Sequence, residues 1–192
     1  MEPVQNSSKQ THSAVNDATQ SLFIKKCPKV IQITEVPGYS NFVPPPFAVY
    51  SAGKFDKTGG HLLLPGTAVK LFIPPGAITD GTEQAVFLYI SSEDRYLMPL
   101  EKDEVRLSPS VFCGPKGLTF EKEVFLRIPR WTRNEVKNWK LQIMCTKTDV
   151  NEDTCFQKTE ECLPIVNDEF VTIIVDHFAG FGVKGKQDTS VA

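Results

Sequence analysis

Short runs in which apolar and polar residues alternate recur along the chain from Val69 to Val183. The runs place these residues at every second position: Val69-Leu71-Ile73, Val86-Leu88-Ile90, Val124-Leu126-Ile128, Leu141-Ile143-Cys145, Ile173-Val175-His177 and Phe181-Val183. Turn-forming residues separate several of them, as at Pro74-Pro75-Gly76 and at Pro129. Such alternation is typical of strands with one buried face. The pattern predicts an all-β fold, an antiparallel β-sandwich.

Helical patterns are nearly missing from the sequence. Only residues 132–141 could form a short helix, and Trp139 within them could instead fill the core. Strands do not alternate with helical stretches, which argues against a parallel sheet.

The first part of the chain differs in character from the rest. Residues 1–20 are rich in Ser, Thr, Asn and Gln and lack periodic apolar positions, so they cannot offset the entropy lost on ordering. Val30-Ile31-Gln32-Ile33 could form an edge strand, and Pro44-Pro45-Pro46 favours an extended segment. This segment either separates the tail from the domain or packs along its side. The expected division is a disordered tail (1–27), an extended proline-rich connector (28–51), the sandwich domain (52–185) and a frayed C-terminal tail (186–192).

Charge and hydropathy exclude several classes of partner. The net charge of the 192 residues is −2, and Lys and Arg are spread along the chain, which argues against nucleic acid. The apolar run 170–175 is far shorter than the about 20 residues that span a bilayer. The first 20 residues lack an apolar secretory signal. We expect a cytoplasmic protein without membrane insertion, associated with membranes only through its partners.

Cysteine and histidine spacing gives little support to a metal site or a disulfide scaffold. The five cysteines form no Cys-x-x-Cys pair, and the three histidines are isolated. These residues predict a reduced protein that has neither a metal site nor a cofactor.

Two turn-rich blocks carry the most specific pattern. The first joins residues 53–62 to 69–78, and the second spans 107–118. Together they resemble the ZU-five (ZU5) domain, the module shared by zonula occludens scaffolds, Unc-five netrin receptors and ankyrins. The resemblance covers about 52–184 and, after Arg130, is closest to the Unc-five type. It implies a β-sandwich that serves as an interaction platform.

The residues that carry the resemblance are typical of turns and close packing, and not of catalysis or ligand binding. Gly59-Gly60 can supply positive φ for a tight hairpin, and Pro74-Pro75-Gly76 fits a type II turn. Residues 113–117 predict another rigid turn, with Cys113 as a small buried plug. We assign structural roles to the following motif residues: Gly59, Gly60, Pro74, Pro75, Gly76, Ser108, Pro109, Cys113, Gly114, Pro115 and Gly117.

The resemblance also points to a place where some relatives carry chemistry. Certain ZU-five domains cut their own backbone at a His-Phe-Ser motif, where the serine hydroxyl attacks the preceding carbonyl. This chain has His177-Phe178-Ala179 at that place. Because a methyl group cannot act as a nucleophile, we expect a vestigial motif, no catalytic residue and an uncleaved chain. His177 is then an ordinary strand residue.

The remaining candidate motifs point to no enzyme. Gly180, Gly182 and Gly185 match Gly-x-Gly-x-x-Gly, but a polar tail follows them instead of the helix that a dinucleotide site needs. The acidic stretch 149–161 is expected to be a mobile loop that could meet a basic partner. Ser190 lies two positions before the C-terminus, as in PDZ ligands, but Ala192 offers little apolar surface, and a frayed tail is the simpler interpretation.

The sequence therefore predicts a non-catalytic protein–protein interaction or scaffold module in intracellular signalling or in cytoskeletal and junction organisation. Its expected partners are cytoskeletal, junction or death-domain signalling proteins, with weak self-association through an exposed apolar patch. Two alternatives remain open. One is a short signalling protein or fragment similar to the Unc-five netrin receptors, and the other is a self-cleaving domain inactivated at Ala179.

Overall fold

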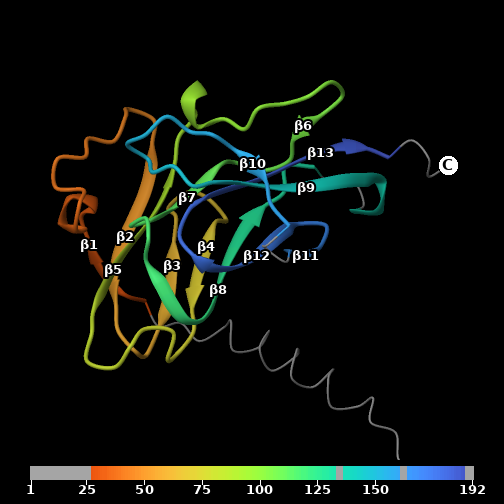
Figure 1. Cartoon of the computed structure of the whole chain (residues 1–192). Coiled ribbons are helices and arrows are strands. Elements are labelled where there is room, and N and C mark those ends of the chain that lie inside the picture. Colours follow the sequence, from red (N-terminus) through yellow and green to blue (C-terminus); the bar gives the residue numbers. More distant parts are fainter. Residues whose placement is uncertain (1–26, 133–135, 161–163, 189–192) are drawn as a thin grey trace, which may run out of the picture.

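The computed structural model describes residues 27–132, 136–160 and 164–188. They form an antiparallel β-sandwich (Figure 1). The strands are β1 (Lys29–Ile31), β2 (Val49–Phe55), β3 (Gly60–Leu63), β4 (Lys70–Ile73), β5 (Gln84–Ile90), β6 (Val105–Arg106), β7 (Val111–Gly114), β8 (Thr119–Pro129), β9 (Trp139–Thr146), β10 (Gln157–Lys158), β11 (Pro164–Val166), β12 (Phe170–His177) and β13 (Gly180–Gln187). The larger sheet has the order β1-β2-β5-β7-β13-β9-β10, with β6 also paired to β13, and the smaller has the order β11-β12-β8-β4-β3. The predicted all-β sandwich is confirmed.

The smaller sheet follows the alternating pattern closely. In β8 the side chains of Val124, Leu126 and Ile128 are buried, whereas Glu123 before them and Arg127 between the last two are exposed. Val171, Ile173 and Val175 of β12 are buried in the same way. These side chains pack against the inner face of the larger sheet in one core. One buried face per strand is what period-two alternation predicts.

The larger sheet is covered on both faces. Val86 and Leu88 of β5 point into the core between the sheets, whereas Phe87 and Tyr89 belong to a second apolar cluster on the outer face. Residues 33–42 supply four buried side chains to this cluster, namely Ile33, Val36, Tyr39 and Phe42. The segment 28–51, expected as a connector, therefore packs along the side of the domain, and β1 pairs with β2 (Figure 1, orange).

The acidic stretch after β9 is held against this second cluster. Val150 and Phe156 are buried, and Tyr96 donates a hydrogen bond to the Val150 carbonyl at 2.8 Å. The Tyr39 hydroxyl donates to the Asp149 carboxylate. The expectation of a mobile loop is wrong for the described part of this stretch, because its few apolar residues anchor it to the sheet.

Helical structure among the described residues is limited to three short 3-10 turns: η1 (Ile33–Glu35), η2 (Asp94–Tyr96) and η3 (Val136–Asn138). In the described part of the stretch 132–141, where a short helix was considered, the helical residues are those of η3, and Trp139 already begins β9. No helix in the described part of the chain has the length and apolar character needed to cross a bilayer. The tails expected at 1–27 and 186–192, including the PDZ-like end, lie mostly outside the described residues. Lys186 and Gln187, expected in the second tail, instead belong to β13 and pair with β9.

Candidate interaction groove and the Ala179 crossing

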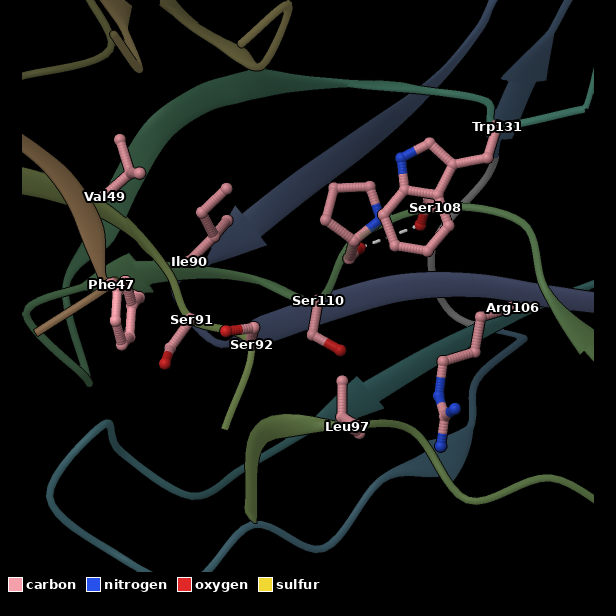
Figure 2. A pocket seen from close by; sticks show the side chains of 11 residues that line it. Phe47, Val49, Ile90, Ser91, Ser92, Leu97, Arg106, Ser108, Ser110 and Trp131 are labelled. Carbon is pink, nitrogen blue, oxygen red and sulfur yellow. Dashed lines mark hydrogen bonds between the residues drawn. The ribbon is translucent and has the colours of Figure 1, made fainter. Parts of the chain in front are cut away.

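A groove of about 230 Å³ opens where two strands of the larger sheet separate. The pairing of β5 with β7 ends at Tyr89 and Phe112, and the chain segments beyond them diverge. The lining residues are Phe47, Val49, Ile90, Ser91, Ser92, Leu97, Arg106, Ser108, Pro109, Ser110 and Trp131 (Figure 2). They come from separate stretches of the sequence that only the folded sheet brings together.

Hydrogen bonds on two sides hold the loop 107–110, which forms one wall of the groove. The Leu107 amide donates to the Val183 carbonyl at 2.8 Å, and the Trp131 amide donates to the Leu107 carbonyl at 2.8 Å. The Ser108 hydroxyl accepts a hydrogen bond from the buried Val183 amide at 2.9 Å and donates to the Pro109 carbonyl at 2.9 Å. Ser108 thus replaces a backbone acceptor where the strand pairing is interrupted. The wall is consequently a fixed feature of the fold.

Two aromatic side chains stand at the rim of the groove. Phe47 is 89% exposed and Trp131 is 58% exposed, whereas most large aromatic side chains of the described chain are buried. Buried aromatic anchors contribute much of the binding energy in protein interfaces, and an exposed pair beside an apolar groove is typical of a binding surface. Sequence reasoning missed both residues because neither belongs to an alternating run. The Pro44-Pro45-Pro46 run before Phe47 was the available signal.

Among the described residues that line the groove, Arg106 is the one with a charged side chain. Its Nε donates to the Met98 carbonyl at 2.9 Å, and no carboxylate lies within ion-pair distance of it among the described residues. Glu104, the acid nearest in sequence, instead contacts Lys184 at 2.6 Å, and this hydrogen bond holds the pKa of Glu104 below its usual value. The Arg106 charge is therefore not compensated by an acidic neighbour.

Ser110 adds a polar group to the apolar floor. The residue is 4% exposed, and its hydroxyl has no hydrogen-bond partner among the described residues. Figure 2 shows this hydroxyl on the side of the groove where Leu97 and Arg106 lie. A buried hydroxyl without a partner is energetically costly, so a position that retains one invites a partner from outside.

The His177-Phe178-Ala179 motif lies where the chain crosses from one sheet to the other. His177 ends β12 in the smaller sheet, and Gly180 begins β13 in the larger sheet. Phe178 is 2% exposed and packs edge-on against Phe120 with ring centroids 4.8 Å apart. Ala179 is 7% exposed, and its carbonyl accepts a hydrogen bond from the Cys113 amide at 2.9 Å. The crossing is a closed part of the core whose nucleophile position carries a methyl group.

The predicted plug, Cys113, is buried beside this crossing. Burial raises the pKa of its thiol, so the thiol stays protonated at neutral pH and is a poor nucleophile. Within the described residues no group of His, Cys, Asp and Glu side chains is arranged to hold a metal ion.

The three glycines of the Gly-x-Gly-x-x-Gly match lie inside β13 and serve close packing. A Cβ at Gly180 would lie 2.7 Å from Phe112 Cε1, and one at Gly182 would lie 2.4 Å from Met98 Sδ. At Gly185 the Lys140 carbonyl oxygen would lie 2.6 Å away. Such spacing leaves no room for a side chain and explains the match without a dinucleotide.

Gly59, Pro75, Gly76 and Gly117 lie in turns as expected, whereas Gly60 begins β3 and Cys113 and Gly114 end β7 instead of belonging to a turn. Gly59 has φ +66°, and a Cβ there would lie 2.2 Å from the Ile73 carbonyl oxygen. Gly76 has φ +79°, and the Ala77 amide donates to the Pro74 carbonyl at 3.1 Å, as in a type II turn. The Gly114–Pro115 peptide is cis, and Gly117 has φ +82°.

Comparison with known proteins adds a consistent result. Residues 51–147 match the family model of the ZU5 domain. The chain is 34% identical over 133 residues to tight junction protein 1 of Canis lupus familiaris and to tight junction protein ZO-1 of Rattus norvegicus. It is 36% identical over 128 residues to tight junction protein 1 of Mus musculus. Each match covers 66% of this chain but only 6–7% of the length of the relative. All three relatives are tight junction proteins, and the closeness to the Unc-five type stays a prediction.

Proposed function

Because this chain belongs to the ZU5 domain family, we propose that it is a non-catalytic module that binds other proteins within a scaffold. The names of its relatives support a role in the organisation of cell junctions. Since the chain corresponds to a small part of those proteins, their other activities are not transferred to it. The proposal includes a cytoplasmic location, with membranes reached through partners.

The observation that carries this proposal is the groove between Phe47 and Trp131. Its exposed aromatic rim, apolar floor and uncompensated Arg106 are features that protein interfaces share. The groove is also small. A volume of about 230 Å³ is below the range of typical small-molecule pockets, about 300–1,000 Å³, and suits the side chains of a protein segment.

The absence of catalysis is part of the same proposal. Ala179 supplies no nucleophile for the backbone cleavage known in some relatives, and the thiol of Cys113 is buried and protonated. We therefore propose that the domain acts by binding alone and that its motif residues keep the sandwich in shape.

Affinity capture from native cytosol tests this proposal. The intact chain is used as bait and captured proteins are identified by mass spectrometry, with an unrelated β-sandwich of similar charge as the control. We expect junction or cytoskeletal proteins to be enriched over the control. Enrichment of death-domain adaptors would instead favour the Unc-five-like alternative, and capture equal to the control would contradict a binding function.

A further inference from the structure

We propose that the groove between Phe47 and Trp131 binds a partner segment that presents an apolar side chain next to a carboxylate. This inference rests on the proposed binding function and gives it a recognition chemistry. The apolar side chain lies between the two aromatic rings, and the carboxylate pairs with Arg106.

The apolar part of this requirement comes from the groove walls. Val49, Ile90 and Leu97 line the groove between the exposed rings of Phe47 and Trp131. Burying apolar surface contributes about 25 cal/mol per Å², so a partner gains most by placing a Leu-, Ile- or Phe-sized side chain here. The groove volume of about 230 Å³ accommodates one or two such side chains.

The acidic part comes from Arg106. Its guanidinium keeps donor positions beyond the one bonded to the Met98 carbonyl. The nearby acid Glu104 is already paired with Lys184, so the positive charge at the groove is complementary to an incoming carboxylate. Arg106 is the one basic residue among the described residues of the groove, and the net charge of the chain is −2, so an anionic membrane or a nucleic acid would find little attraction here.

The Ser110 hydroxyl gives a second, independent indication of a ligand. It is buried at the floor and has no partner among the described residues. A hydroxyl can donate to a carboxylate or to a backbone carbonyl of a bound segment. Binding would therefore satisfy a polar group that the isolated domain leaves unpaired.

Hydrogen bonds within the domain hold the walls of the groove in place. The backbone of Trp131 is held by a hydrogen bond that its amide donates to the Leu107 carbonyl. The preceding Arg130 is buried and donates to the Asn167 carbonyl at 2.9 Å. Ser108 fixes the opposite end of the wall through the Val183 amide. A preformed site avoids the free energy of ordering a loop on binding.

A displayed library of short random peptides, selected on the intact chain, tests the recognition chemistry. We expect enriched peptides to share a large apolar residue adjacent to Asp or Glu. Synthetic copies are then titrated into isotope-labelled protein, and the two indole N–H signals are followed by NMR. Trp131 lies at the groove rim, whereas Trp139 begins β9, so only the Trp131 signal should shift.

Matched variants locate the contacts. Phe47→Ser should weaken binding of a selected peptide about tenfold, whereas Val43→Ser, at an exposed apolar residue of the same segment, should leave it unchanged. Arg106→Gln should weaken binding about tenfold for the acidic peptide and have no effect on its Asn or Gln counterpart. Lys57→Gln, which removes a distant exposed charge, is the control. Thermal unfolding of each variant shows that it remains folded.

Several outcomes would overturn the inference. These are selection of basic peptides, equal binding of acidic and amide peptides, a shift of signals away from the groove, or no enrichment at all. The proposed function is tested separately. If a protein captured from cytosol still binds the Phe47→Ser and Arg106→Gln variants, the chain has a binding function but this groove does not provide it. If the Trp131 indole signal shifts with protein concentration in the absence of peptide, the groove would instead bind a second copy of the chain.

Discussion

The Ala179 crossing and the Phe47–Trp131 groove lie at opposite ends of β7 and differ in almost every respect. The crossing carries the residues that the family resemblance links to backbone cleavage, yet Phe178 and Ala179 are buried and Ala179 stands where that motif has a serine. The groove carries no motif of a known activity, yet it exposes aromatic surface and an uncompensated charge. The difference shows that a sequence motif marks where members of a family can carry out a reaction. The exposure of side chains shows where a particular member can bind a partner.

Substitutions of two phenylalanines should give the largest difference in stability between the crossing and the groove. Phe178→Ala removes a core ring packed on Phe120 and should lower the free energy of unfolding by about 3–5 kcal/mol. Phe47→Ala removes an exposed ring and should change it by less than about 0.5 kcal/mol. Chemical denaturation of both variants measures the two values. Equal losses would mean that Phe47 is part of the core and not of a binding rim.

Two serines of the groove loop give a smaller test. Ser108→Ala leaves the buried Val183 amide without its acceptor and should cost about 1–3 kcal/mol of unfolding free energy. Ser110→Ala removes a buried hydroxyl that has no hydrogen-bond partner in the described part of the chain, so stability should be unchanged within about 0.5 kcal/mol or rise. Denaturation measures stability, and titration with a selected peptide should show weaker binding for Ser110→Ala. A marked loss of stability in Ser110→Ala would show that the Ser110 hydroxyl makes a stabilising hydrogen bond, and would contradict the account.

The Lys184–Glu104 pair near the groove should make the free energy of unfolding depend on pH. Because the hydrogen bond from Lys184 lowers the pKa of folded Glu104, this pair stabilises the fold above the ordinary Glu pKa of 4.5. That contribution is lost as pH falls through the lower pKa of the folded state. Unfolding free energies between neutral and acidic pH should therefore fall less steeply for Glu104→Gln than for the natural chain. Identical slopes would show that the pair is not formed in solution.

The last prediction concerns the crossing itself, where we expect no cleavage of the backbone. The intact mass of the purified chain should stay that of the full sequence during prolonged incubation, because Ala179 cannot form an ester intermediate. Mass spectrometry checks this. Fragments that meet at Phe178 and Ala179 would contradict the proposed absence of catalysis.

Several strands of the sandwich could be predicted because they obey a local rule, whereas β2, β3, β6, β7, β10 and β11 were not predicted. Val124-Leu126-Ile128 and Ile173-Val175 alternate, and in the structure they are buried as that alternation predicts. Cys113 was predictable as a buried plug because a small apolar residue beside Gly114-Pro115 has few other uses.

The second core could not be read in the same way. Ile33, Val36, Tyr39 and Phe42 follow no strand period, since they cover the outer face of a sheet from a segment with little regular structure. The groove was also beyond local rules, because Phe47, Ile90, Arg106 and Trp131 meet only through the strand order. A triple proline before an aromatic residue was the one local signal.

Hydrogen–deuterium exchange of the chain, alone and with a partner captured from cytosol, tests the central claim most directly. The account predicts new protection in the segments around Phe47, Ser91 and Ser110, with exchange at the Phe178–Ala179 crossing unchanged. Protection confined to the crossing or to distant strands, with the groove segments unchanged, would contradict it.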